Sequence, residues 1–239
     1  MAMKKYTRRI VGYVFKAICV LIIASVIGLL LWRIADSRTD PQPVKVIMVN
    51  DSLQAAYESN NGKLTVFYQD QSKYTQAEDN YGYFAATQCY FIKEADQLQV
   101  TLRYNNSTLK YLREDYSLIN IPEREDNVFD ITVVVAYDLT PDNDSDNFGN
   151  DEESVRFERF YSTDMLSHQK TLYNYRKLTF DDIKIDESVL AVYLDIYYVG
   201  DANYNEEPYG TLLLYDYTEE NIEYKLSAKD INAIKNYGK

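Results

Sequence analysis

The chain starts with a run of apolar residues that is long enough to cross a membrane. IVGYVFKAICVLIIASVIGLLLW extends from Ile10 to Trp32. A helix of this length measures about 34 Å, and the hydrocarbon core of a bilayer is roughly 30 Å thick. Lys16 lies close enough to the start for its long side chain to reach the interface, and Trp32 ends the run where indole rings prefer to lie. The sequence therefore predicts a transmembrane helix over residues 10–32.

The charges on either side of this run predict its orientation. Residues 1–9 contain four basic residues and no acidic one, whereas residues 33–43 contain two of each. The positive-inside rule then places the N-terminus in the cytoplasm and the remainder outside. A cleaved signal peptide is the alternative, but LLLWRIADS offers no small-x-small cleavage site. We expect a single-pass protein of the cell membrane with a cytoplasmic tail (1–9), a short linker (33–43) and an extracytoplasmic domain (44–239).

The remainder of the chain is strongly acidic. Residues 1–32 carry five of the 25 basic residues and no acid, which leaves 20 basic residues against all 37 acidic ones, a net charge of −17. Nucleic-acid binding depends on cationic contacts to phosphate, so DNA and RNA are excluded as expected partners.

Residues that commonly carry catalysis are sparse. The two cysteines, Cys19 and Cys89, lie one in the apolar run and one outside it, so no disulfide forms within the outer domain. His168 is the only histidine, and neither a CxxC pair, a GxSxG elbow nor a glycine-rich phosphate loop is present. We therefore expect a protein without enzymatic activity. A hydrolase with two carboxylates in a concave cleft is the enzymatic alternative.

Alternating polar and apolar residues predict that the outer domain is mainly β. In QLQVTLRY, one face carries Leu98, Val100, Leu102 and Tyr104 and the other carries Gln97, Gln99, Thr101 and Arg103. VFDITVVVAYD (128–138) and VLAVYLDIYYV (189–199) repeat the pattern, and Tyr193, Asp195 and Tyr197 lie on the polar face of the latter. Such alternation is typical of antiparallel strands with one buried and one solvated face.

Further strands are expected near residues 44–49, 63–69, 83–92, 154–161, 171–180 and 210–217. Short helices are expected at 51–61, ended by Asn60–Asn61–Gly62, at 107–115, and at 227–236, where Ser227 and Asp230 have the spacing of a capping box. About nine strands with few helices predict an antiparallel β-sandwich of immunoglobulin-like architecture that follows the transmembrane helix.

The stretch DNDSDNFGNDEE is a candidate calcium loop. Its potential ligands at positions 1, 3, 5, 7, 9 and 12 are Asp142, Asp144, Asp146, the carbonyl of Phe148, Asn150 and Glu153. Position 6 is Asn147 instead of glycine, and strands instead of helices flank the loop. A solvated acidic loop without bound Ca²⁺ is the alternative.

Tyrosine is abundant, with 24 residues. Six of them lie between residues 195 and 217, around the loop GDANYNEEPYG. Tyr193, Tyr197, Tyr204 and Tyr209 are the predicted ligand-binding residues, because tyrosine suits contact surfaces, although strands favour aromatic residues in any case. We expect a membrane-attached binding domain for a partner protein or an envelope polysaccharide. An accessory subunit that docks through its transmembrane helix is the alternative.

Overall fold

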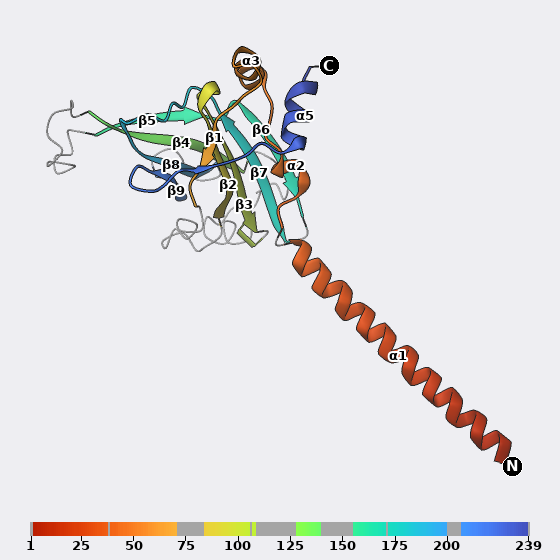
Figure 1. Cartoon of the computed structure of the whole chain (residues 1–239). Coiled ribbons are helices and arrows are strands. Elements are labelled where there is room, and N and C mark those ends of the chain that lie inside the picture. The colour runs from red at the N-terminus through yellow and green to blue at the C-terminus, as the bar shows by residue number, and fades with distance from the viewer. Residues whose placement is uncertain are drawn as a thin grey trace. The chain divides into compact units, whose positions relative to one another are not determined.

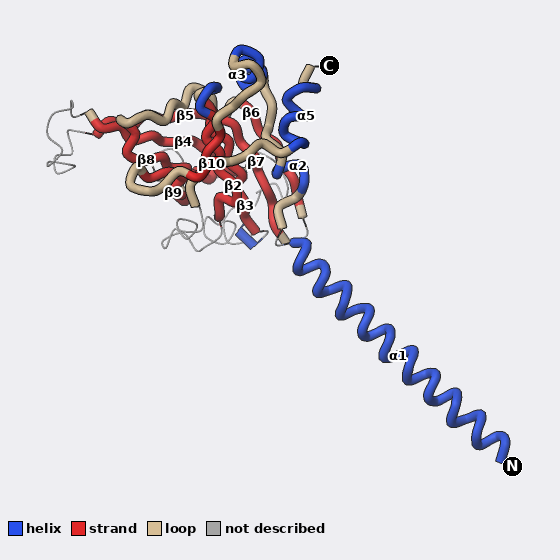
Figure 2. Tube along the Cα trace, in the orientation of Figure 1, coloured by secondary structure: helices blue, strands red, loops and turns tan. Residues whose placement is uncertain are grey.

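The computed structural model describes residues 2–37, 39–70, 84–105, 107–108, 128–139, 155–170, 172–199 and 207–238. The chain divides into two compact units, Met1–Asp40 and Pro41–Lys239. The second is called the β unit below, because half of its described residues lie in strands (Figures 1 and 2).

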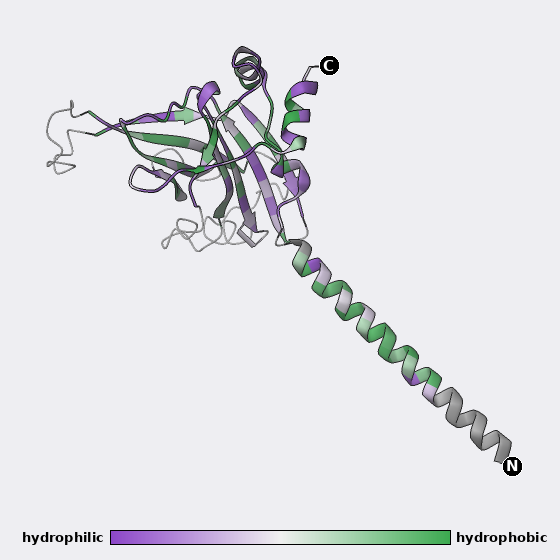
Figure 3. Ribbon diagram, viewed as in Figure 1, coloured by the Kyte–Doolittle hydropathy of each residue, from purple (hydrophilic) through white to green (hydrophobic). Residues whose placement is uncertain are grey.

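The first unit contains one helix, α1 (Ala2–Ser37). Its segment Tyr13–Ala35 has the length and composition of a membrane span, and a signal sequence passes the same test. Large apolar side chains along it are exposed, among them Leu21 at 66% and Leu30 at 55%. Figure 3 shows this apolar character along the coloured part of α1. The predicted N-terminal apolar helix is therefore confirmed.

Ten strands form two antiparallel sheets in the described part of the β unit. The six-stranded sheet has the order β10-β1-β2-β3-β7-β6 and the four-stranded sheet the order β5-β4-β8-β9. The strands are β1 (Val66–Tyr68), β2 (Phe84–Ile92), β3 (Gln97–Asn105), β4 (Phe129–Asp138), β5 (Val155–Tyr161), β6 (Asp164–Gln169), β7 (Tyr173–Phe180), β8 (Val189–Tyr198), β9 (Gly210–Asp216) and β10 (Ile222–Glu223). The predicted mainly β class is therefore confirmed.

Both sheets contribute to one hydrophobic core. Leu98, Val100 and Leu102 of β3 belong to the same cluster as the alternating apolar residues of β4 and β8, among them Val133 and Leu194. All five are fully buried. The apolar halves of the three alternating patterns therefore form the core, as the sequence predicts.

The described part of the β unit also contains the short helices α2 (Gln42–Lys45), α3 (Asp51–Ser59) and α5 (Ala228–Asn236) and the 3₁₀ turn η2 (Lys93–Ala95). The helix expected at 107–115 lies outside the described residues beyond 108. Helix α3 ends before Asn61 and Gly62, which have positive φ angles of 54° and 75°. Ser227 caps α5 in a capping box with Asp230. Both helices begin and end close to the predicted residues.

The polar face of β3 is not solvated, which corrects the prediction. Gln97 and Gln99 are 1% exposed and Thr101 is 0% exposed. Residues 44–50, called the covering segment here, run past this face. Gln99 donates from Nε2 to the carbonyl of Met48 at 2.6 Å and accepts from the Met48 amide at Oε1 at 2.8 Å. Buried polar groups need hydrogen-bond partners, and here the backbone of the covering segment supplies them, although that segment is not a strand of the sheet.

The predicted strand at 44–49 is wrong, because these residues form the end of a short helix and then a segment that side chains hold in place. Helix α2 occupies its start, and the Val44 amide donates to the carbonyl of Pro41 at 3.1 Å. The following residues are held by side chains. Lys177 Nζ donates to the carbonyls of Val44 and Val46, at 3.1 and 2.6 Å, and Asp230 Oδ1 accepts from the Ile47 amide at 2.9 Å.

Two strands were not predicted, β6 and β10. β6 lies in the polar stretch that contains His168, and it pairs with β7, where His168 lies opposite Tyr175. β10 has only two residues and pairs with β1. Neither segment shows a sustained alternation of apolar residues, so the periodicity on which the prediction depends is missing.

Candidate functional site

The candidate calcium ligands lie outside the described residues, namely Asp142, Asp144, Asp146, Phe148, Asn150 and Glu153. Across the described ranges, no three His, Cys, Asp or Glu residues are grouped so that they could hold a metal ion. Calcium binding by the acidic loop stays a prediction.

The four predicted ligand-binding tyrosines have different environments. Tyr204 lies outside the described residues. Tyr193 is half-buried, and Tyr209 packs against the core with its ring centroid 6.0 Å from that of Phe84. Tyr197 is only 1% exposed. The prediction that Tyr197 and Asp195 lie on a solvated face is therefore wrong, while the binding role of the tyrosines stays a prediction.

The buried Tyr197 hydroxyl belongs to a polar network that joins three strands. Arg159 of β5 donates from Nη2 to Tyr197 Oη at 2.8 Å, and its guanidinium lies 5.3 Å from the centre of the Tyr197 ring. Tyr197 Oη donates to Asp195 Oδ2 at 3.4 Å, and Thr211 Oγ1 of β9 donates to Asp195 Oδ1 at 2.7 Å. Burial and the nearby Asp195 raise the pKa of Tyr197, whereas Arg159 lowers it. The hydroxyl therefore remains a hydrogen-bond donor at neutral pH.

The network belongs to the face of the four-stranded sheet that points away from the core. Cross-strand partners share a face, so the register gives its rows. One row consists of Arg159, Val134, Tyr193 and Leu213, and a second of Tyr161, Thr132, Asp195 and Thr211. These residues, together with Phe157, are called the outer face below. Phe157 and Tyr161 on β5 are 65% and 64% exposed.

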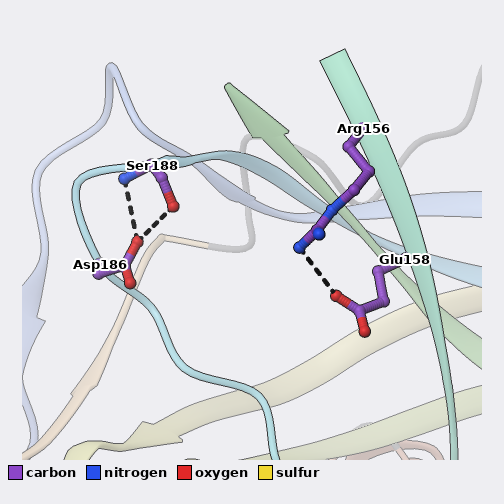
Figure 4. Close-up of polar contacts among 4 residues, drawn as sticks. All are labelled: Arg156, Glu158, Asp186 and Ser188. Atoms are coloured by element: carbon purple, nitrogen blue, oxygen red, sulfur yellow. Dashed lines mark hydrogen bonds and ion pairs between the residues drawn. The ribbon is translucent and has the colours of Figure 1, made fainter. Parts of the chain in front are cut away.

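The opposite face of β5 carries a pair of charges (Figure 4). Arg156 Nη2 lies 3.3 Å from Glu158 Oε2, and their side chains are 58% and 48% exposed. The guanidinium of Arg156 also lies 5.0 Å from the centre of the Tyr137 ring. Burial raises the pKa of Tyr137, as do Glu158 and Asp186, whereas Arg156 lowers it. An exposed pair of this kind contributes little stability, so its charges are available to a partner.

The β unit also contains a cleft of about 1190 Å³. Its lining combines four carboxylates and two lysines with apolar and neutral polar groups. The lining residues are Thr65, Val66, Phe67, Lys93, Asp138, Lys184, Ile185, Asp186, Glu187, Ser188, Tyr215, Asn221 and Glu223. A smaller cavity of about 110 Å³ shares Phe67, Lys93, Lys184 and Ile185 with it.

The cleft is concave and carboxylates line it, which are two of the features that the hydrolase alternative requires, but the pKa of Asp186 does not favour an acid catalyst. Ser188 donates to Asp186 Oδ1 from its hydroxyl at 2.6 Å and from its amide at 3.0 Å (Figure 4). The hydroxyl hydrogen bond lowers the pKa of Asp186, burial raises it in part, and the Ser188 amide and Lys184 lower it further, so that the pKa is lowered overall. A general acid needs a carboxyl group whose pKa is raised, so Asp186 is suited to the role of an anion instead.

The sequence prediction did not single out Arg159, which connects the strands of the outer face. A signal was present, because the stretch VRFERFY alternates arginine with aromatic residues at the spacing of one strand face. Its partner Tyr197, however, lies 38 residues away, and Thr211 joins the network only through Asp195. Comparison of the chain with family models, with curated proteins and with solved structures gave no match.

Proposed function

We propose that this chain is a single-pass membrane protein whose β unit binds a partner protein through the outer face of its four-stranded sheet. The observation that carries the proposal is the combination of an apolar helix of membrane-spanning length with a separate β unit that has its own core. The N-terminus lies in the cytoplasm and the β unit outside, because the basic residues precede the helix.

The β unit has an immunoglobulin-like topology in this proposal. When β2 to β9 are given the letters A, B, C, C′, D, E, F and G in chain order, the sheet orders become A-B-E-D and C′-C-F-G. These are the strand orders of immunoglobulin-type sandwiches. β1 and β10 then extend the sheet beyond strand A, and a core without the disulfide takes the place of the usual cysteine pair.

The outer face has the composition of a protein-binding surface. Interfaces between proteins are enriched in tyrosine, phenylalanine and arginine, and their energetic centres are aromatic or arginine residues that are held in place. Phe157 and Tyr161 are exposed, and Arg159 is held by Tyr197. A side chain that is already held in place, as Arg159 is, loses little conformational entropy on binding.

Anchoring is tested by charges in the middle of α1. We expect Ile22→Arg combined with Ile23→Arg to release the protein from the membrane fraction, because each arginine at the centre of a span costs about 2.5–3.5 kcal/mol on insertion. The measurement is the amount of chain that resists extraction at alkaline pH. The matched control is Ile22→Leu with Ile23→Leu, which should remain membrane-bound. A mature wild-type chain that starts near residue 36 would instead identify a signal sequence.

Partner binding is tested by capture with the full chain in detergent. If a partner binds the outer face, its capture should be lost with Tyr193→Lys and retained with the control His168→Ala on β6. Capture should also be retained when α1 is replaced by an unrelated membrane helix. Loss on helix replacement alone would support docking through the helix instead. Cleavage of an envelope polysaccharide by the purified chain would contradict a purely binding role.

A further inference from the structure

β5 is an edge strand that is open to a further strand. It pairs with β4 on one side, and the described residues contain no second neighbour for it. Five of its seven residues are exposed, including Phe157 at 65% and Tyr161 at 64%. An exposed edge with large apolar side chains invites pairing with another strand, and proteins normally protect such edges.

The other edge of the same sheet differs, because none of the seven residues of β9 is exposed and a side chain protects the backbone of its last residue. Gln69 is fully buried, and its side-chain amide takes the place of a neighbouring backbone beside β9. Its Nε2 donates to the carbonyl of Asp216 at 2.9 Å, and its Oε1 accepts from the Asp216 amide at 2.9 Å. β5 has no comparable side chain over its backbone in the described ranges. The two edges of the sheet therefore differ, and β5 is the one that is left for a partner.

The faces of β5 restrict how two copies of it can pair. Val133 lies opposite Phe160 and Val135 opposite Glu158, so the even-numbered residues of β5 share the core side of the sheet. The odd-numbered residues share the outer face. Residues that lie directly opposite in antiparallel strands must be on the same face. A two-fold axis between two β5 strands therefore passes through a pair of identical residues.

Charge decides which residue lies on the axis. An axis at Arg156, Glu158 or Arg159 places two like charges directly opposite each other, which is destabilising. An axis at Phe160 pairs only the last three residues of the strand. An axis at Phe157 places Arg156 opposite Glu158 of the second copy, twice by symmetry, and pairs the two Phe157 rings. Opposite charges and aromatic pairs both stabilise cross-strand contacts.

We propose that β5 pairs antiparallel with β5 of a second copy of this chain, with Phe157 on the two-fold axis. The occupant of the edge is a second copy because the sequence Arg156–Phe157–Glu158 is complementary to itself in this register. Within one chain, Arg156 and Glu158 lie 3.3 Å apart and are about half exposed. Both charged groups are therefore accessible to a second copy at the edge. The two four-stranded sheets become one continuous eight-stranded sheet.

The interface is small, since five residues of each strand, Val155 to Arg159, pair in this register. Stable dimers usually bury about 1,200–2,000 Å², so a contact of this size is weak in dilute solution. Confinement to one membrane raises the effective concentration of the two copies. The dimer is therefore to be sought in the membrane in which the full chain is expressed.

Cysteine scanning tests the register. Single cysteines are placed at residues 155, 156, 157, 158 and 159 of the full chain with Cys19→Ser, while Cys89 stays because it is buried and its pKa is raised by burial. Mild oxidation of membranes should give the most disulfide-linked dimer with Phe157→Cys and less on either side, because the axis brings only these two Cβ atoms close together. A maximum at any other position, or no dimer at any of the five, overturns the proposal.

A charge exchange tests the pairing between copies. Arg156→Glu and Glu158→Arg are each expected to abolish dimers of identical chains, because like charges then face each other. Two differently tagged chains, one with each substitution, should be captured together when they are coexpressed, since every cross-strand pair is again attractive. The double variant R156E/E158R should pair with itself as the wild type does.

This result separates pairing from effects within one chain. Loss of the intrachain contact between Arg156 and Glu158 is the same in mixed and unmixed single variants, so it cannot restore capture in the mixture. Equal capture in all combinations overturns the proposal. The inference rests on the proposed anchor, which supplies the effective concentration, but the two failures are distinguishable. Loss of the chain from the membrane fraction would refute the anchor, whereas a membrane-bound chain without the expected pattern of capture would refute the pairing.

Discussion

Replacement of Asp230 by alanine is expected to lower the free energy of unfolding of the β unit by about 3 kcal/mol. Asp230 is 1% exposed, and its carboxylate accepts four hydrogen bonds. The donors are the Ile47 amide at 2.9 Å, the Ser227 amide at 2.8 Å, the Ser227 hydroxyl at 2.6 Å and the Tyr224 hydroxyl at 3.1 Å. Alanine leaves these donors without an acceptor, and it separates α5 from the covering segment.

The measurement is urea unfolding of the full chain in detergent, followed by near-ultraviolet circular dichroism of the tyrosines. The single tryptophan, Trp32, lies in α1 and therefore does not report on the β unit. Exposed Glu220→Ala is the control, with an expected change within about 0.5 kcal/mol. An Asp230→Ala chain as stable as the control would contradict the role of this carboxylate.

The pH dependence gives a second readout of the same group. Burial raises the pKa of Asp230, but the hydrogen bonds from Ser227, Ile47 and Tyr224 outweigh it, and the pKa is lowered overall. A lowered folded-state pKa stabilises the fold above the unfolded value of about 3.9, and this contribution is lost as the pH falls through the folded-state value. The difference in stability between wild type and Asp230→Asn should therefore shrink on acidification below about pH 4. A constant difference would indicate that charge is not involved.

Much of the β unit is predictable because its core strands alternate strictly. The apolar residues of β3, β4 and β8 face one shared core, and a local pattern is sufficient to identify them. The capping box of α5 is likewise local, since Ser227 and Asp230 are three residues apart. Features that depend only on residues close together in the sequence can therefore be predicted from it.

The polar halves of the same strands could not be predicted, because their burial depends on distant segments. Gln99 is buried by contacts with Met48, 51 residues away, and Asp230 binds the Ile47 amide across 183 residues. A glutamine that faces water and one that faces a covering segment have the same local pattern. The outer face follows the same logic, since Arg159, Tyr197 and Thr211 come from three strands. Only the register places them together.

The covering segment also depends on a buried lysine. Lys177 of β7 is 1% exposed, and its Nζ donates to the carbonyls of Val44 and Val46. It lies 6.0 Å from the centre of the Tyr90 ring. The amine therefore attaches the first residues of the β unit to the six-stranded sheet.

Lys177→Ala is expected to lower the free energy of unfolding by about 4 kcal/mol, because it removes both hydrogen bonds and leaves the space of the stem empty. Lys177→Met keeps an unbranched stem of similar length and loses the donors and the charge near the Tyr90 ring, so we expect a loss of about 2 kcal/mol. Both are measured by the same urea unfolding. In Lys177→Met, amide hydrogen exchange should accelerate across residues 44–50 while the amides of β4 and β8 remain protected, since the core between the sheets is unchanged. Equal losses in the two variants would mean that the packed stem contributes nothing, and unchanged exchange at residues 44–50 would mean that the amine does not hold the covering segment.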